Sequence, residues 1–252
     1  DKRNKVAGDR FMLLGNIAAS NYAFDVAVNC YKYIIEKGPE NEFYISAKTE
    51  YLNTLYQKVV VMSDFKNTEL IELESNFIST LKEIGETPAT FPLIKNLTHL
   101  QAFYLNKADT AINMLERLLK SAALKPSQIS ECKIELSDIL LFNEDPWQAS
   151  LYYAQVEKAN KQQPIGHEAK FRKARLAYYT GDFRWAEAQL DVLKASTSKL
   201  IANDALYLAL LINDNIDLEF DTLNIALKYF SEADLLIYRN KDSLAMLKQI
   251  GR

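Results

Sequence analysis

Apolar and polar positions follow the period of an α-helix along most of the chain, and one apolar spacing recurs four times. In each copy an alanine is followed four residues later by tyrosine or leucine, and seven residues later by isoleucine, leucine or valine. These copies begin at Ala27, Ala111, Ala149 and Ala186. The offsets place the three residues on one helix face. Because the later copies lie 38 and 37 residues apart, and the first gap of 84 holds one unmarked unit, the pattern predicts a series of helix pairs that bury their faces on one another.

Turn residues and helix caps divide this pattern into predicted helices. Gly38-Pro39, Gly85 with Pro88, and Gly181-Asp182 are expected to end helices or turn the chain, while Asp64 and Asp145 are expected N-caps. The predicted helices span 5–20, 23–37, 42–62, 64–84, 91–105, 107–121, 127–142, 146–160, 166–179, 183–195, 200–212, 221–238 and 241–250. The segment 86–90 is the expected hinge or boundary.

Composition and charge favour a folded helical chain and exclude several classes of partner. The 252 residues are 48% apolar and 25% charged, with only 7 Gly and 6 Pro, which suits many helices joined by short connections. The net charge of −3 gives no electrostatic footprint for nucleic acid or anionic membrane. Because the chain has no run of about 18 apolar residues, we expect no membrane insertion. Cys30 and Cys132 are expected to be small core residues.

We find no catalytic, cofactor or metal motif in the sequence. His99 and His167 lie in different repeats, and no phosphate loop, nucleophile elbow or Cys/His cluster is present, so we expect no enzymatic activity and no cofactor. His99 is expected to be packed or partly buried. An acidic stretch could attract calcium, but it lacks the glycine and closing glutamate of an EF-hand, so helix capping and an acidic loop explain it better. Its oxygen-bearing residues are Asn213, Asp214, Asn215, Asp217, Glu219 and Asp221.

The repeats resemble the tetratricopeptide repeat (TPR) family, whose unit is a hairpin of two helices. The first repeat carries Phe11, Leu14-Gly15, Ala18, Ala27, Tyr31, Ile34 and Pro39; the fourth Leu136-Ser137, Leu140, Ala149, Tyr153 and Val156; the fifth Gly181-Asp182-Phe183, Ala186, Leu190 and Leu193. The match departs at Lys95, Lys133 and Lys170, which take the place of a bulky aromatic residue, and at repeat lengths of 37–42 instead of 34. The segment from Gly181 to Ala205 is also similar to bacterial repeat proteins, some of which are exported or lipid-anchored.

This resemblance implies an all-α fold, a right-handed α-α superhelix of about six antiparallel helix hairpins. We expect a single TPR-like domain over 1–252 that is a fragment of a longer repeat protein. The compartment stays open between an exported, periplasmic or lipid-anchored parent protein and a cytoplasmic one.

The resemblance also indicates where a partner would bind, because the first helices of such hairpins line a concave face. It places Asn16, Asp138, Phe171, Arg175 and Tyr178 there. The alternative, which we favour for Phe171 and Tyr178, is packing between helices. A clamp for a peptide's terminal carboxylate is rejected, because Met12, Ile134 and Phe171 stand at its basic or polar positions and Asp138 would repel the ligand.

The fourth and fifth repeats are also rich in basic residues: Lys158, Lys161, Lys170, Arg172, Lys173 and Arg175. They could form a basic face for an acidic peptide. A solvated face with i,i+4 partners such as Glu168–Arg172 is the favoured interpretation.

The leading functional hypothesis is therefore a non-enzymatic scaffold that binds a protein or peptide segment in its concave groove. A structural spacer or self-assembling section of a longer repeat protein is the alternative, with end-to-end self-association through exposed apolar faces. A small-ligand-binding protein is a weaker alternative, since the sequence offers no converging set of titratable groups.

Overall fold

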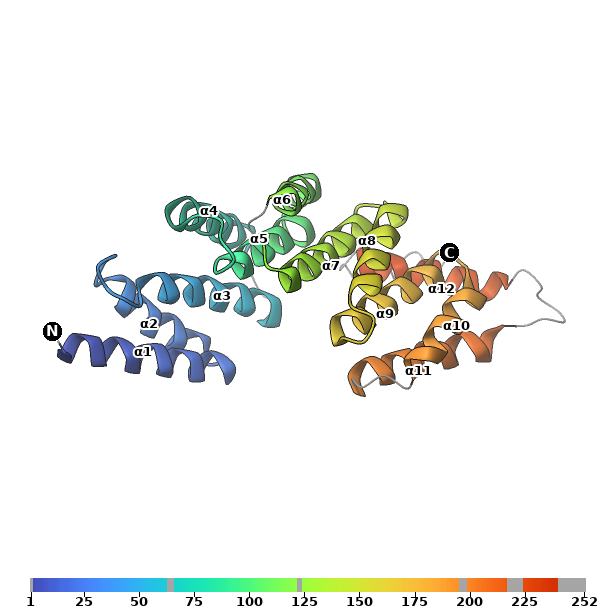
Figure 1. Ribbon diagram of the computed structural model, residues 1–252, viewed down its shortest axis with the longest axis horizontal. Coiled ribbons are helices and arrows are strands. Elements are labelled where there is room, and N and C mark those ends of the chain that lie inside the picture. Colours follow the sequence, from blue (N-terminus) through green and yellow to red (C-terminus); the bar gives the residue numbers. More distant parts are fainter. Residues whose placement is uncertain (1, 63–65, 122–123, 195–198, 217–223, 240–252) are drawn as a thin grey trace. The chain divides into compact units, whose positions relative to one another are not determined.

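The structure, a computed structural model, describes residues 2–62, 66–121, 124–194, 199–216 and 224–239, and this part of the chain contains helices and no strand (Figure 1). The helices are α1 (Lys2–Ser20), α2 (Phe24–Ile35), α3 (Tyr44–Met62), α4 (Asn67–Ile84), α5 (Phe91–Phe103), α6 (Ala108–Lys120), α7 (Pro126–Phe142), α8 (Pro146–Ala159), α9 (Pro164–Tyr179), α10 (Phe183–Leu193), α11 (Lys199–Asn215) and α12 (Ile225–Arg239). The predicted all-α class is confirmed. The predicted helix at 241–250 lies outside the described residues. None of the described helices is long and apolar enough to cross a bilayer.

The chain divides into two compact units, residues 1–132 and 133–252. In the first unit α1 packs on α2, α2 on α3, α3 on α4 and α5, and α5 on α6. In the second unit α8 packs on α9, α9 on α10, and α10 on α11, while α12 packs on α9 and α11. Within each unit, consecutive helices therefore pack on one another as the repeat pattern predicts.

The four marker alanines lie at the centre of these helix pairs. Ala27, Ala111, Ala149 and Ala186 are all fully buried. The residues four positions later, Tyr31, Leu115, Tyr153 and Leu190, are fully buried as well. An alanine lets two helix backbones approach closely, and the larger residue one turn later fills the space beside the contact. The prediction that this spacing marks the inner face of the second helix is confirmed.

The expected turn chemistry ends and begins the helices. Gly85 follows α4 with a φ of +82°, and Gly181 lies between α9 and α10 with a φ of +84°, a left-handed conformation that favours glycine. Asp145 caps α8 by accepting a hydrogen bond of 3.0 Å from the backbone N–H of Gln148. The predicted cap Asp64 lies outside the described residues. At the described start of α4, the backbone N–H of Lys66 donates to the Glu69 carboxylate at 3.0 Å.

The segment 86–90 is held by hydrogen bonds within the first unit. The Thr90 hydroxyl donates to the carbonyl of Gly85 at 2.8 Å, and the Gln128 amide donates to the carbonyl of Pro88 at 2.7 Å. The Arg117 guanidinium pairs with both carboxylate oxygens of Glu86, at 2.9 and 2.7 Å. The hinge at this segment and the single domain over 1–252 stay predictions.

The cysteines and His99 have the surroundings that their positions predict. Cys30 and Cys132 are buried thiols, and burial raises the pKa of Cys30. His99 is half-buried among aromatic rings, with the centroid of Phe103 at 4.4 Å and that of Tyr56 at 6.0 Å. These three residues therefore contribute to packing.

Two glycines beside α9 should respond differently to alanine, although each change adds one methyl group. A Cβ at Gly166 would lie 2.0 Å from the carbonyl oxygen of Asn160, whereas a Cβ at Gly181 would meet no atom within 4 Å. Replacing glycine by alanine inside a helix usually stabilises it by about 0.5–1 kcal/mol. At Gly166 the clash of the added Cβ with the backbone outweighs this effect, so Gly166→Ala should lower the free energy of unfolding by roughly 2 kcal/mol. The strained φ at Gly181 should make Gly181→Ala cost about 1 kcal/mol. Urea denaturation measures both, and a stabilising Gly166→Ala would contradict this packing.

Candidate functional site

Three of the five predicted binding residues occupy one repeat position. Asn16, Asp138 and Arg175 each lie fifteen residues before the large marker residue of their own hairpin, which is Tyr31, Tyr153 or Leu190. The Tyr31 hydroxyl donates to the Asn16 side-chain oxygen at 2.7 Å, and the Tyr153 hydroxyl donates to the Asp138 carboxylate. At this position, therefore, a polar residue accepts a hydrogen bond from the second helix wherever that helix supplies tyrosine.

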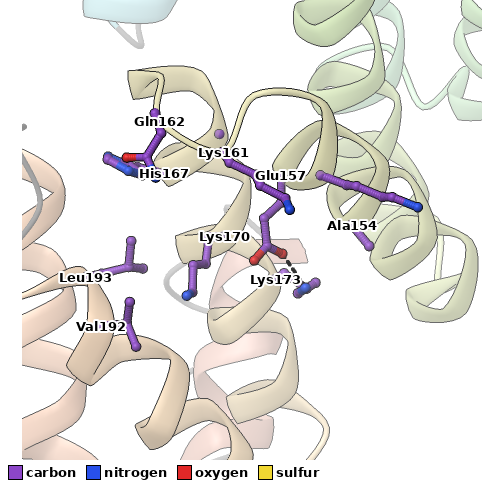
Figure 2. A pocket seen from close by; sticks show the side chains of 11 residues that line it. Ala154, Glu157, Lys161, Gln162, His167, Lys170, Lys173, Val192 and Leu193 are labelled. Carbon is purple, nitrogen blue, oxygen red and sulfur yellow. Dashed lines mark hydrogen bonds and ion pairs between the residues drawn. The ribbon is translucent and has the colours of Figure 1, made fainter.

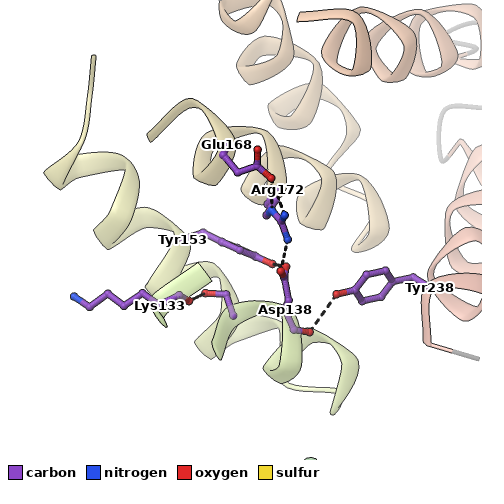
Figure 3. A network of polar contacts seen from close by, with 7 residues as sticks. Lys133, Asp138, Tyr153, Glu168, Arg172 and Tyr238 are labelled. Atoms are coloured by element: carbon purple, nitrogen blue, oxygen red, sulfur yellow. Dashed lines mark hydrogen bonds and ion pairs between the residues drawn. The ribbon is translucent and has the colours of Figure 1, made fainter. Parts of the chain in front are cut away.

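Asp138 is the centre of a buried polar network in the second unit (Figure 3). Its carboxylate accepts from the Tyr153 hydroxyl and forms an ion pair with Arg172. Arg172 also donates from Nε to Glu168 at 2.8 Å, which confirms the predicted i,i+4 pair. Burial lowers the pKa of Arg172, but the Asp138 carboxylate reverses this and leaves the pKa above its ordinary value. This network joins α7, α8 and α9 with the charge of Asp138 paired.

Helix α12 lies against the same set of residues. The Tyr238 hydroxyl donates to the backbone carbonyl of Asp138 at 3.2 Å (Figure 3). Arg239 donates from Nε to the carbonyl of Leu141 at 3.1 Å. Arg239 also forms an ion pair of 3.5 Å with Glu144. Since α12 packs on α9 and α11 as well, it covers first helices of three successive hairpins. We call this covered surface of α7, α9 and α11 the A-helix face.

Arg175 belongs to the A-helix face and contacts α12 directly. Its guanidinium carbon lies 5.7 Å from the ring centroid of Phe171 and 5.8 Å from that of Tyr238, both within the range of cation–π attraction. The ring of Tyr179 lies 6.3 Å from that of Tyr238. Asp234 on α12 is half-buried, and burial raises its pKa while Arg175 opposes the rise. The structure thus brings Asp138, Phe171 and Arg175 together, under a helix of the same chain.

Tyr178 is a core residue. Its side chain is fully buried, and its ring packs 5.6 Å from that of Tyr179 and 6.0 Å from that of Phe183. Burial raises its pKa, and its hydroxyl has no hydrogen-bond partner among the described residues. Tyr178 therefore packs between helices, as the favoured alternative predicted. The prediction that its side chain lies on an open binding face is wrong.

Asn16 lies in the first unit, beside a small surface cavity. The cavity measures about 300 Å³, and Tyr31, Glu50 and Thr54 also line it. Burial raises the pKa of Glu50. Asn16 is exposed, and one side of its amide is already occupied by the Tyr31 hydroxyl. A contact between Asn16 and a partner stays a prediction.

The six basic residues of the fourth and fifth repeats separate into two groups. Arg172 and Arg175, three residues apart, both face the α12 side of α9. Lys158, Lys161, Lys170 and Lys173 instead line a cleft of about 660 Å³ formed by the end of α8, the start of α9 and the end of α10 (Figure 2). A helix with 3.6 residues per turn explains the division, because residues 167, 170 and 173 share one face and residues 168, 172, 175 and 179 share another.

The acidic stretch begins in the last turn of α11 and continues beyond the described residues. The described residues contain no group of three or more His, Cys, Asp or Glu side chains able to hold a metal ion. Asp217, Glu219 and Asp221 lie outside the described residues.

Comparison with known proteins supports the fold. No family model matches the sequence, and no curated protein matches it. The structure is similar to the crystal structure of a tetratricopeptide repeat protein from Parabacteroides merdae ATCC 43184, with a TM-score of 0.58 and 15% sequence identity over 96% of this chain and 87% of that one. The predicted TPR-like arrangement of helix hairpins is confirmed, and a likeness at this identity shows the fold alone.

Two buried tyrosines test the assignment of the polar network and of the core. Tyr153 and Tyr178 are both fully buried, but only the Tyr153 hydroxyl has a described acceptor. Tyr153→Phe leaves Asp138 short of a donor and should lower the free energy of unfolding by about 1–3 kcal/mol. Tyr178→Phe removes an unpaired hydroxyl and should change it by less than about 0.5 kcal/mol, or raise it. Urea denaturation of both variants measures the difference, and equal losses would contradict the assignment.

Proposed function

We propose that the protein is a non-enzymatic scaffold that binds a helical segment of a partner protein on the A-helix face. The observation that carries this proposal is the seat of α12, a helix that lies across α9 and α11 and bonds to α7 through its last two residues. A surface that accommodates one helix in this way has the shape and the polar groups to accommodate another.

The chemistry of the seat indicates what a partner helix would present. Leu141 lies in the last turn of α7, where carbonyl groups lack partners within the helix. Its carbonyl accepts from the backbone N–H of Glu144 at 3.3 Å and also from Arg239 of α12 at 3.1 Å. Arg175 offers a planar cation to an aromatic ring, as it does to Tyr238. A partner helix with an aromatic residue next to a basic residue would reproduce both contacts. Arginine and aromatic side chains are also the residues that dominate binding energy at interfaces.

It follows that α12 and a partner compete for the A-helix face. A partner must displace α12, so its apparent affinity is reduced by the fraction of molecules in which α12 is seated. Weakening the contacts of α12 should therefore strengthen partner binding, whereas removing the side chains of the face should weaken it.

Capture of partners from a lysate of the native source tests this proposal with three forms of the full chain. Tyr238→Ala/Arg239→Ala, which weakens only the α12 side, should enrich a specific partner by several-fold over the wild type in quantitative mass spectrometry. Phe171→Ala/Arg175→Ala, which removes side chains of the face, should lose the same partner. Circular dichroism of each form provides the control for folding. A partner captured equally by all three forms, or none captured by any form, would contradict binding on the A-helix face.

Self-association is a second candidate function, and the surface of α1 favours it. Leu13, Leu14 and Ile17 are 61%, 48% and 52% exposed on this helix. Contiguous exposed apolar residues are typical of interaction surfaces. If copies of the chain associate through α1, sedimentation equilibrium should show a concentration-dependent oligomer that Leu13→Glu/Ile17→Glu converts to monomer. A wild type that is monomeric at all concentrations would exclude this role for the chain.

A further inference from the structure

The lysine-lined cleft on the other side of α9 lies apart from the seat of α12. Its cationic walls come from Lys158 at the end of α8, Lys161 in the turn that follows, and Lys170 and Lys173 on α9. Val192 and Leu193 of α10 close it (Figure 2). Its lining does not include Asp138, Leu141, Glu144, Arg175 or Tyr179, the residues that bond to or stack on the end of α12. A molecule in this cleft would therefore leave the A-helix face unobstructed.

The cleft carries a surplus of positive charge on a chain that is acidic overall. Lys173 is neutralised by an ion pair with Glu157, the carboxylate that shares the lining, and its ammonium also lies 5.3 Å from the ring centroid of Trp185. Among the residues that the structure describes, no carboxylate pairs with Lys158, Lys161 or Lys170. Since the whole chain has a net charge of −3, these lysines form a local feature and do not reflect a generally basic surface.

The walls of the cleft are also partly apolar, and this distinguishes among anionic ligands. Val192 is 62% exposed, and Ala154 lines the same space. A small inorganic anion would contact the lysines and leave these methyl groups bare, and it would fill only a small part of 660 Å³. A nucleic acid would favour flat aromatic rings for stacking and a basic surface beyond the cleft. The lining contains no Phe, Tyr or Trp, and the chain is acidic.

We propose that this cleft binds an acidic peptide segment of a partner protein, with its carboxylates on Lys158, Lys161 and Lys170 and a small apolar side chain against Val192. The site goes beyond the proposed function, because it uses a different face of α9 and a different class of ligand. Lysine ammonium groups act as point charges on flexible stems, so the cleft selects for charge density and not for one carboxylate geometry. Charge of this kind mainly speeds association and makes it dependent on salt.

Fluorescence anisotropy with a defined probe tests the proposal on the full chain. The probe is a fluorescein-labelled peptide of about ten residues that alternates glutamate and alanine around a central leucine, and the comparison peptide has glutamine at each glutamate. The wild type should bind the glutamate peptide saturably, and its affinity for this peptide should fall as NaCl is added. It should bind the glutamine peptide roughly tenfold less tightly. The double variant Lys161→Glu/Lys170→Glu should lose roughly tenfold or more in affinity.

A matched variant controls for the change in net charge. Lys120 and Lys125 are exposed lysines of the first unit that do not line the cleft, so Lys120→Glu/Lys125→Glu alters the total charge equally. This control should bind the probe as the wild type does, and circular dichroism confirms that both variants fold. Equal losses in the two double variants would overturn the proposal, as would the absence of saturable binding.

Competition experiments separate the acidic peptide from other anions. The competitors are inorganic phosphate and a short single-stranded oligonucleotide. If either displaces the probe at the same concentrations as unlabelled peptide does, the peptide assignment is overturned. Displacement only by the unlabelled glutamate peptide is the expected result. Tyr238→Ala/Arg239→Ala should leave probe binding unchanged, so failure at this cleft and failure at the A-helix face can be told apart.

Discussion

Each marked hairpin closes where its two helices approach one another at a small residue. Ala27, Ala111, Ala149 and Ala186 have no exposed surface, and each is accompanied by a large buried residue one turn later. In the first hairpin Gly15 of α1 also makes room for the Tyr31 ring of α2, because an added Cβ at Gly15 would lie 2.6 Å from that ring. A bulky side chain on one helix therefore fills the space that a small residue on the other helix leaves open. This complementary packing fixes how each hairpin closes.

The closure of the hairpin also decides what surrounds one polar position on its first helix. Asn16, Asp138 and Arg175 lie fifteen residues before Tyr31, Tyr153 and Leu190, so they occupy equivalent places in their hairpins. Where the second helix supplies a tyrosine hydroxyl, the residue is an acceptor and is held by its own hairpin. Where it supplies leucine, Arg175 turns to aromatic rings, including that of Tyr238 on α12. One repeat position thus holds the two helices of a hairpin together in two hairpins, and in a third it contacts α12.

The fold could be predicted from local patterns, whereas the seat of α12 could not. The predicted helices at 127–142 and 183–195 correspond to α7 at Pro126–Phe142 and α10 at Phe183–Leu193, because turn residues and apolar spacing are properties of neighbouring residues. The predicted helix at 221–238 covers most of α12, but the sequence did not predict which helices α12 packs on. Tyr238 reaches the carbonyl of Asp138 across 100 residues of sequence, and hydrogen bonds to backbone carbonyls have no side-chain signature at the acceptor.

The candidate site could be predicted only in part, because local sequence patterns do not position α12. Spacing predicted the Glu168–Arg172 pair, and the family resemblance placed Asp138, Phe171 and Arg175 on one face. The interval of fifteen residues to Tyr153 would also have indicated the acceptor role of Asp138. The stripe formed by Phe171 and Tyr178 does not reveal which of its members a neighbouring helix covers, and Tyr178 is buried beside Phe183. The difference between the two faces of α9 depends on α12, which local periodicity does not position.

Hydrogen–deuterium exchange of the 252-residue chain, read on the backbone amides of α12, shows whether α12 is seated on the A-helix face. If α12 is seated on the A-helix face, its amides are protected well beyond the level of an isolated fifteen-residue helix, which is marginal in water. Arg175→Ala should then increase exchange in α12 while leaving exchange in α2 unchanged. Amides of α12 that exchange in the wild type as fast as those of an unstructured peptide, or protection that Arg175→Ala does not alter, would contradict the account.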